Sequence, residues 1–258
     1  MLNSLKAILD DQSPAQTKII MDARAYAHKV LMQNKPYPWH DATLYSNYMK
    51  QVHSLLQADV LVLRFDKMLE EELKNNHELV AKMGEKQRSG YALKVFMADE
   101  GIREITSSLI NTATNTLHVS IMTQLPSPLA LLQMTAQAVG KDQDFDDDLI
   151  ENAGIYYADW LRSYKDSKVT GLLFDERDHT LKPQHYQPIT NTASNYDWVV
   201  GFRRASVLEF MGYTQPIPIL DSAFWLGEKT APPPAPLFFT EIHQDAMPEK
   251  VLEKLHQF

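Results

Sequence analysis

The sequence has 258 residues, of which 44% are hydrophobic and 22% charged, and these proportions are typical of a globular protein. It contains no cysteine, which excludes disulfides, a cysteine nucleophile and zinc sites with thiolate ligands. The formal net charge of −8 disfavours nucleic-acid binding, because an acidic surface repels phosphate backbones.

The start of the sequence lacks the basic region and the clean apolar run of a signal peptide. No stretch approaches the roughly 18 uninterrupted apolar residues that a membrane helix needs. We therefore expect a cytoplasmic protein with no membrane partner. Whether the chain forms a homo-oligomer stays open.

Residues 1–57 are predicted to be helical. Ser13 and Gln16 form a capping box, with a proline at the first helical position. Apolar residues then recur at helical spacing over residues 19–31. A second amphipathic helix is predicted over residues 41–57.

Strand and helix patterns alternate after residue 57. The predicted strands cover residues 58–66, 91–97, 116–123, 169–175, 198–202, 215–221 and 237–242. The predicted helices cover residues 67–83, 102–110, 126–139, 146–164, 205–211 and 248–258. Two prolines in residues 215–221 favour an edge strand or an extended loop there, and residues 177–197 look polar and irregular.

This alternation predicts βα units and a parallel sheet. We expect an α/β protein with a single domain, in which a TIM-like (β/α) barrel, with irregularities, covers residues 58–258. The helices of residues 1–57 would pack on that barrel. An open doubly wound sheet is the alternative, although the glycine-rich phosphate-binding loops of nucleotide-binding sheets are missing.

Charged residues follow several of the predicted strands, and the carboxyl ends of parallel barrel strands meet at the face that carries the active site. Side-chain alternation places Arg64 and Asp66 on one side of the first of these strands, and Asp175 and Arg177 on one side of another. The predicted catalytic residues are Asp66, Asp175, Glu176 and His118. The predicted substrate-binding residues are Arg64, Arg177, Arg203, Asp221, Glu241 and His243.

Arg64 and Asp66 test this interpretation most directly. A charge on a buried strand must either meet an opposite charge or face a water-filled opening. We expect the second situation, so Asp66→Ala would leave the melting temperature nearly unchanged and abolish ligand binding.

Three stretches between residues 117 and 177 carry a resemblance to a known family. Residues 118–132 read His-Val-Ser-Ile-Met-Thr-Gln-Leu-Pro-Ser-Pro-Leu-Ala-Leu-Leu, residues 156–161 read Tyr-Tyr-Ala-Asp-Trp-Leu, and residues 171–177 read Gly-Leu-Leu-Phe-Asp-Glu-Arg. This segment resembles the superfamily of barrel enzymes that includes uroporphyrinogen decarboxylase and cobalamin-independent methionine synthase. The resemblance implies a barrel in which Asp175 and Glu176 match the acidic residues at a strand end.

The expected function is that of a barrel enzyme acting on a small anionic organic molecule by lyase or transferase chemistry. The arginines would bind the anionic group, and Asp66 or Asp175 would transfer protons. One alternative is a non-catalytic barrel that binds a ligand or a partner. Another is a metal-dependent hydrolase that uses Asp175, His179 and His185. The cofactor stays unknown, and no metal is assigned.

Overall fold

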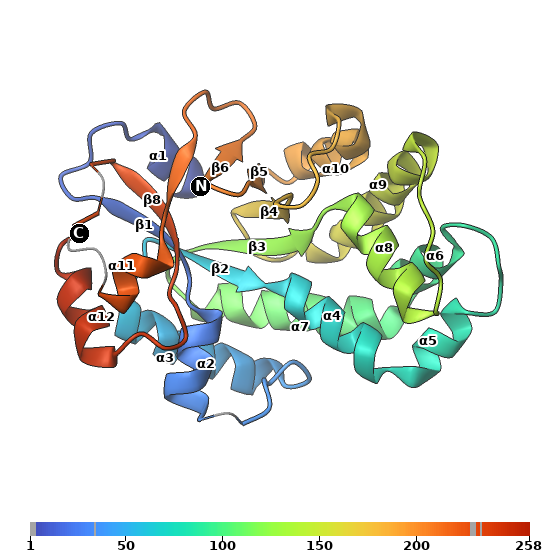
Figure 1. Cartoon of the computed structure of the whole chain (residues 1–258), viewed down its shortest axis with the longest axis horizontal. Helices are drawn as coiled ribbons and strands as arrows, with labels where there is room; N and C mark the ends of the chain where they lie inside the picture. Colours follow the sequence, from blue (N-terminus) through green and yellow to red (C-terminus); the bar gives the residue numbers. More distant parts are fainter. Residues whose placement is uncertain (1–3, 34, 228–230, 233) are drawn as a thin grey trace.

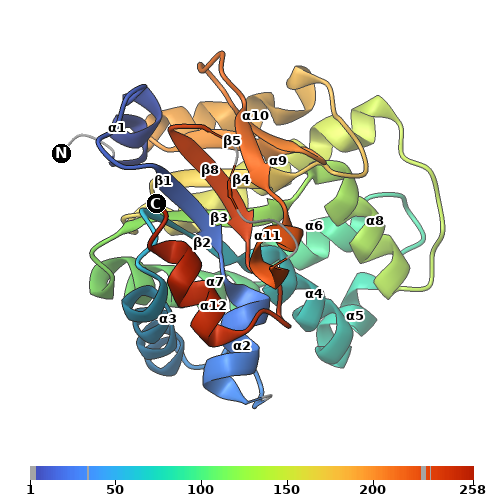
Figure 2. The same cartoon turned by 60° about the vertical axis from the view of Figure 1, so that its left-hand side comes forward.

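A computed structural model describes residues 4–33, 35–227, 231–232 and 234–258. Eight strands close into a barrel in chain order, with helices packed around it (Figures 1 and 2). The strands are β1 (Lys18–Asp22), β2 (Val60–Arg64), β3 (Ser120–Pro126), β4 (Gly171–Asp175), β5 (Val199–Arg203), β6 (Val207–Phe210), β7 (Ile217–Leu220) and β8 (Leu237–Glu241). The predicted TIM-like barrel, including its irregular character, is confirmed.

The first half of the chain supplies α1 (Ser4–Asp10), α2 (Arg24–Met32), α3 (Ala42–Leu56), α4 (Phe65–Asn75), α5 (His77–Met83), α6 (Tyr91–Ala98) and α7 (Glu100–Thr116). The second half supplies α8 (Pro128–Ala138), α9 (Asp147–Leu161), α10 (Pro183–Asn195), α11 (Ser222–Leu226) and α12 (Pro248–Leu255), with a 3-10 turn at Arg162–Tyr164. Several helices begin where the sequence supplies a capping side chain. The carboxylates of Asp41, Asp99 and Asp146 accept hydrogen bonds from the first turns of α3, α7 and α9.

The irregularity lies in β6, which runs antiparallel to both β5 and β7, whereas the other neighbouring strands are parallel. Only residues 204–206 connect β5 to β6. Parallel strands need a crossover of a dozen or more residues, while antiparallel strands can be joined by a tight turn. The short connection therefore forces the chain to reverse at β6.

The barrel interior has its own apolar core, separate from the larger core between strands and helices. Its members include Ile20, Val62, Met122, Leu173 and Phe239 from five different strands. Helix α1 lies at the amino end of the barrel (Figure 2). Its residues Leu5 and Leu9 belong to the interior core and close this end.

Gly171 makes room for this plug at the start of β4. A Cβ atom there would lie 2.7 Å from Leu5 Cδ2 and 3.0 Å from the Val199 carbonyl oxygen. A larger residue at position 171 would therefore displace the Leu5 side chain and crowd the Val199 carbonyl, and glycine leaves room for α1.

The prediction that residues 1–57 form only helices packed on the barrel is wrong. Residues 18–22 form β1, which pairs with β2 and β8 and so closes the barrel. A short apolar run such as Ile19-Ile20-Met21 cannot be assigned to helix or strand from periodicity alone, and pairing with two neighbouring strands decides it here. The helix predicted over residues 41–57 is confirmed as α3.

Three further segments differ from their predicted type. Residues 91–97 form α6 rather than a strand, and the buried residues Ala92, Leu93, Phe96 and Met97 occupy one helical face. Residues 205–211, predicted as a helix, contain β6. Residues 177–197, predicted to be irregular, contain α10. The sequence of this helix is mostly polar, so its few buried apolar residues do not produce a clear helical pattern.

The strands predicted near residues 58–66, 116–123, 169–175, 198–202, 215–221 and 237–242 are all present, with shifted ends. The predicted edge strand is β7, which lies within the closed barrel and pairs on both sides. Among the described residues, no helix combines the length and apolar character that crossing a membrane requires.

Candidate functional site

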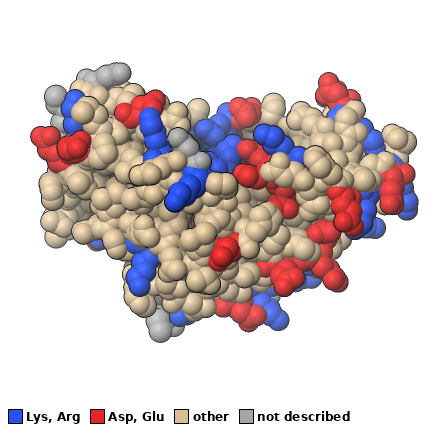
Figure 3. Space-filling model, turned by 90° about the horizontal axis from the view of Figure 1, so that it is seen from below, with Lys and Arg blue, Asp and Glu red and all other residues tan. Residues whose placement is uncertain are grey.

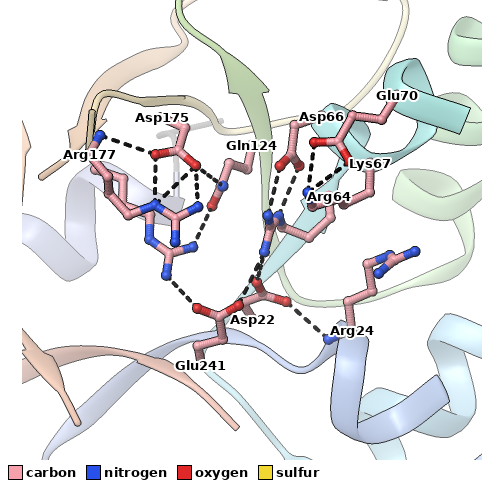
Figure 4. A network of polar contacts seen from close by, with 11 residues as sticks. Asp22, Arg24, Arg64, Asp66, Lys67, Glu70, Gln124, Asp175, Arg177 and Glu241 are labelled. Atoms are coloured by element: carbon pink, nitrogen blue, oxygen red, sulfur yellow. Dashed lines mark hydrogen bonds and ion pairs between the residues drawn. The ribbon is translucent and has the colours of Figure 1, made fainter. Parts of the chain in front are cut away.

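Six polar side chains form the layer of the barrel interior that lies at the carboxyl ends of the strands. Along each strand they continue the alternation of inward-facing apolar residues, as in Val60, Val62 and Arg64 of β2. Strand pairing sets Asp22 beside Glu241, Arg64 beside Gln124, and Asp175 beside Arg203. With Asp66 and Arg177, which extend it, we call this group of eight residues the mouth network (Figure 4).

Arg64 is the centre of one half of the mouth network. Its Nε and Nη2 donate to the two oxygens of Asp66 at 2.8 and 2.7 Å, and its Nη1 donates to Asp22 Oδ2 at 2.5 Å. Nη1 also reaches Glu241 Oε1 at 3.3 Å. Arg64, Asp66 and Asp22 are 6%, 4% and 1% exposed. The Arg64 guanidinium is therefore held by three carboxylates, away from water.

The other half of the network joins β3, β4, β5 and β8. Arg203 donates through Nη2 to Glu241 Oε2 at 2.5 Å and through Nη1 to Gln124 Oε1 at 3.2 Å. Gln124 Nε2 donates to Asp175 Oδ2 at 3.2 Å. Arg177 Nη2 donates to the same oxygen at 2.6 Å, and Arg177 Nε donates to Asp175 Oδ1 at 2.9 Å. Unlike Arg64, the Arg177 side chain is 42% exposed.

The charged groups of the mouth network determine the protonation states of Asp175 and Glu241. Burial by itself raises the pKa of Asp175, but hydrogen bonds from Arg177 and the positive charges of Arg177 and Arg203 outweigh burial and lower it. Burial likewise opposes ionisation of Glu241, whose pKa is lowered by Arg203, Arg64 and Arg177. Both carboxylates are therefore ionised at neutral pH.

Two cavities border the mouth network. One, of about 420 Å³, is lined by Asp66, Asp175 and Arg177 together with polar residues of α4 and α8. The other, of about 550 Å³, is lined by Arg203, Glu241 and residues after β7 and β8. Each is large enough for a small organic molecule.

The face seen in Figure 3 shows basic and acidic side chains next to one another near its middle. Acidic side chains gather toward its right-hand end, where α4 and α5 lie in Figure 1. Charges of both signs therefore meet on this face.

The structure brings together six of the ten residues predicted for the site: Arg64, Asp66, Asp175, Arg177, Arg203 and Glu241. Asp221 and His243 line the larger cavity beside Glu241. Asp221 caps α11, and His243 Nδ1 accepts a hydrogen bond from the Asp245 backbone NH.

Glu176 and His118 lie elsewhere. Glu176 follows the inward-facing Asp175, so its side chain points the other way. Its carboxylate accepts from Tyr186 Oη at 2.7 Å and from the Leu181 backbone NH at 3.0 Å, and it pairs with Arg204. Through these contacts Glu176 stabilises the segment that follows β4. His118 is exposed and precedes β3, at the amino end of the barrel, so its predicted catalytic role has no support in the geometry.

The metal-site alternative is not supported by the geometry. His185 is 2% exposed on α10, and its Nε2 lies 3.3 Å from Asp147 Oδ1, while His179 is exposed. Within the part of the chain that the structure describes, no group of three His, Asp or Glu residues could hold a metal ion.

Asp22 and Gln124 belong to the mouth network and were not predicted. Asp22 was overlooked because its strand was assigned to a helix. Gln124 lies in β3, which is buried along its whole length, and a long amide side chain in such a strand is a signal that the sequence does contain. The signal could be read only with the register of β3.

No protein-family model, no curated protein and no solved structure was found to match this chain. The TIM-like barrel implied by the resemblance to the decarboxylase and methionine-synthase superfamily is present. Membership of that superfamily stays a prediction.

Acid is expected to weaken the fold through Asp175 and Glu241. Because their pKa values are lowered in the folded state, they contribute stability above the pKa of the unfolded chain, about 4, and that contribution is lost as pH falls through the lower folded pKa. Urea unfolding measured from pH 7 to pH 2 should show this loss.

Asp175→Asn should remove part of the acid dependence. The amount is expected to stay below about 1 kcal/mol, because Arg177 is partly solvated. Asp178→Asn, at a neighbouring exposed carboxylate, is the control. Equal acid dependence in Asp175→Asn and in the unmodified protein would contradict the role given to Asp175.

Proposed function

We propose that this protein is an enzyme that binds a small organic molecule through an anionic group at the carboxyl end of its barrel and acts on it by lyase or transferase chemistry. The observation that carries the proposal is the convergence of arginines and ionised carboxylates from five strands beside two cavities. Barrel enzymes place their reacting groups at this end.

Arg177 is the arginine best placed to bind the anion. Its side chain is 42% exposed, and its guanidinium holds both oxygens of Asp175 through Nε and Nη2, a geometry that a carboxylate or phosphate group of a ligand can reproduce. Arg203, 4% exposed and paired with Glu241, is a second partner at the wall of the larger cavity.

Arg64 was predicted to bind substrate, and its surroundings argue against that role. Three carboxylates already occupy its guanidinium, and Arg64 lines neither of the two cavities at the mouth network. We assign Arg64 the task of holding the carboxyl ends of β1, β2 and β8 together.

Asp175 is the proposed base. A ligand anion that takes Arg177 releases Asp175 from its main partner while the carboxylate is still ionised. The released carboxylate can then accept a proton from the ligand beside it. Asp66, the other predicted base, has both oxygens bound to Arg64 and is less available.

The function is tested by Arg177→Met. Binding should first be found by adding a panel of small carboxylates and phosphate esters to the whole protein and recording thermal shifts and calorimetric titrations. For any compound that binds, Arg177→Met should weaken binding at least about tenfold, the effect of losing one charge-assisted pair. Arg162→Met, at an exposed arginine outside the mouth network, is the control.

The rival is a barrel that binds the same ligand without changing it. The mutual pairing of Arg64 and Asp66, which occupies one predicted anion-binding residue and one predicted base, favours it. Incubation of the bound compound with the protein separates the two: an enzyme converts it, and Asp175→Asn abolishes the conversion. Failure of every anion in the panel to bind would contradict the proposed function.

A further inference from the structure

Gln124 is the uncharged member of the layer of six polar side chains at the barrel mouth. It is fully buried, at 0% exposure, and its amide lies between a guanidinium and a carboxylate. A side chain in this place has to satisfy one group that only donates and another that only accepts hydrogen bonds.

Only one orientation of the Gln124 amide meets both demands. Its oxygen accepts from Arg203 Nη1 at 3.2 Å, and its nitrogen donates to Asp175 Oδ2 at 3.2 Å. A flipped amide would direct NH₂ at the guanidinium and oxygen at the carboxylate. A glutamate would serve Arg203 but repel Asp175, and an apolar side chain would serve neither.

The two oxygens of Asp175 are held differently. Oδ2 accepts from Gln124 Nε2 as well as from Arg177 Nη2 and, at 3.2 Å, Arg177 Nε. Oδ1 is bonded by Arg177 alone, through Nε at 2.9 Å and the backbone NH at 3.3 Å. When a ligand takes the Arg177 guanidinium, Oδ2 stays anchored by Gln124. Oδ1 then keeps only the long backbone contact.

We propose that Gln124 is a positioning residue, which anchors Oδ2 of Asp175, ties it to Arg203, and leaves Oδ1 as the oxygen that takes the proton. This inference rests on the proposed function only for its last step. In that step the bond between the ligand and its proton breaks, the electron pair stays on the ligand, and an O–H bond forms at Oδ1. The anchoring itself can be measured without a ligand.

The experiment follows the titration of Asp175 in the whole protein by carboxyl ¹³C NMR, with Asp175→Asn identifying the resonance. Gln124→Met keeps the length of the side chain and removes both hydrogen bonds. The proton affinity of Asp175 should rise about tenfold, the effect of losing one hydrogen bond to a charged group. Gln124→Glu keeps a partner for Arg203 and places a negative charge beside Asp175, so its effect should be larger.

Gln133→Met is the matched control, because Gln133 lines the same cavity as Asp175. It should leave the titration unchanged. A purely structural role of Gln124 would lower the melting temperature without moving the titration of Asp175, and that result would overturn the proposal. If Gln124→Met does not fold, an unchanged titration in Gln124→Glu overturns it equally. Failure of every anion in the panel to bind, or unchanged ligand binding in Arg177→Met, would count against the proposed function while leaving these titrations decisive for Gln124.

Discussion

Arg64→Met is expected to lower the free energy of unfolding by about 3–5 kcal/mol, the usual cost of breaking a buried ion pair by removing one partner. The variant would leave Asp22 and Asp66 as neighbouring carboxylates, 1% and 4% exposed, with no guanidinium between them. Since a chain of this size loses roughly 2–4 °C per kcal/mol, the melting temperature should fall by about 10 °C. Thermal and urea unfolding measure both quantities.

Arg177→Met is the matched control, because it removes the same group from an ion pair that is open to solvent. Its cost should stay within about 1 kcal/mol. A melting temperature within a degree or two of the unmodified protein in Arg64→Met would show that the Arg64 cluster is not structural. That result would favour the sequence-based prediction that Arg64 binds a ligand.

The same burial reverses the sequence-based expectation for Asp66. Asp66→Ala was expected to leave the melting temperature nearly unchanged, on the view that Arg64 and Asp66 face a solvated opening. Both side chains are instead buried and bonded to each other, so Asp66→Ala should destabilise the fold. The loss should be smaller than in Arg64→Met, because Asp22 and Glu241 still neutralise Arg64.

Leu5→Ala should destabilise the protein by about 2–5 kcal/mol, the range for truncating a fully buried leucine. Leu5 is 0% exposed and fills the amino end of the barrel beside Gly171. Removing three carbons there leaves a cavity that strands cannot close without breaking their pairing. Chemical unfolding of the whole protein measures the loss.

Ile8→Ala is the control for the plug. Ile8 lies on the same helix and is only partly buried against the same core, so its truncation should cost clearly less. Equal losses in the two variants would indicate that α1 contributes general helix packing instead of a specific plug. A negligible loss in Leu5→Ala would show that the barrel is stable with its amino end open.

Local sequence patterns were sufficient for most of the barrel. The apolar runs that became β2, β4 and β8 are buried on both faces, which only a covered parallel sheet requires. The polar residues that end these runs could be placed at one face because parallel strands all end there. Six site residues were predicted in this way, by a rule that needs no tertiary detail.

Tertiary contacts decided the rest. Lys18–Asp22 is a strand because β2 and β8 pair with it on both sides, and the short connection at residues 204–206 turns β6 into an antiparallel strand. The strands that pair with β1 and with β6 cannot be identified from the local periodicity of the sequence. The same holds for α6, where burial on one helical face overrides the β-favouring residues of its sequence.

The sequence by itself determined that six of the eight side chains of the mouth network reach the carboxyl end of the barrel, because alternation along a strand and the direction of the chain are local properties. Only the tertiary structure decided what each of them does there. Arg64 and Arg177 both follow apolar strands, yet one is enclosed by three carboxylates and the other is half open to a cavity. Burial and partner number depend on strands far apart in the sequence, and these set whether a charge holds the fold or is available to a ligand.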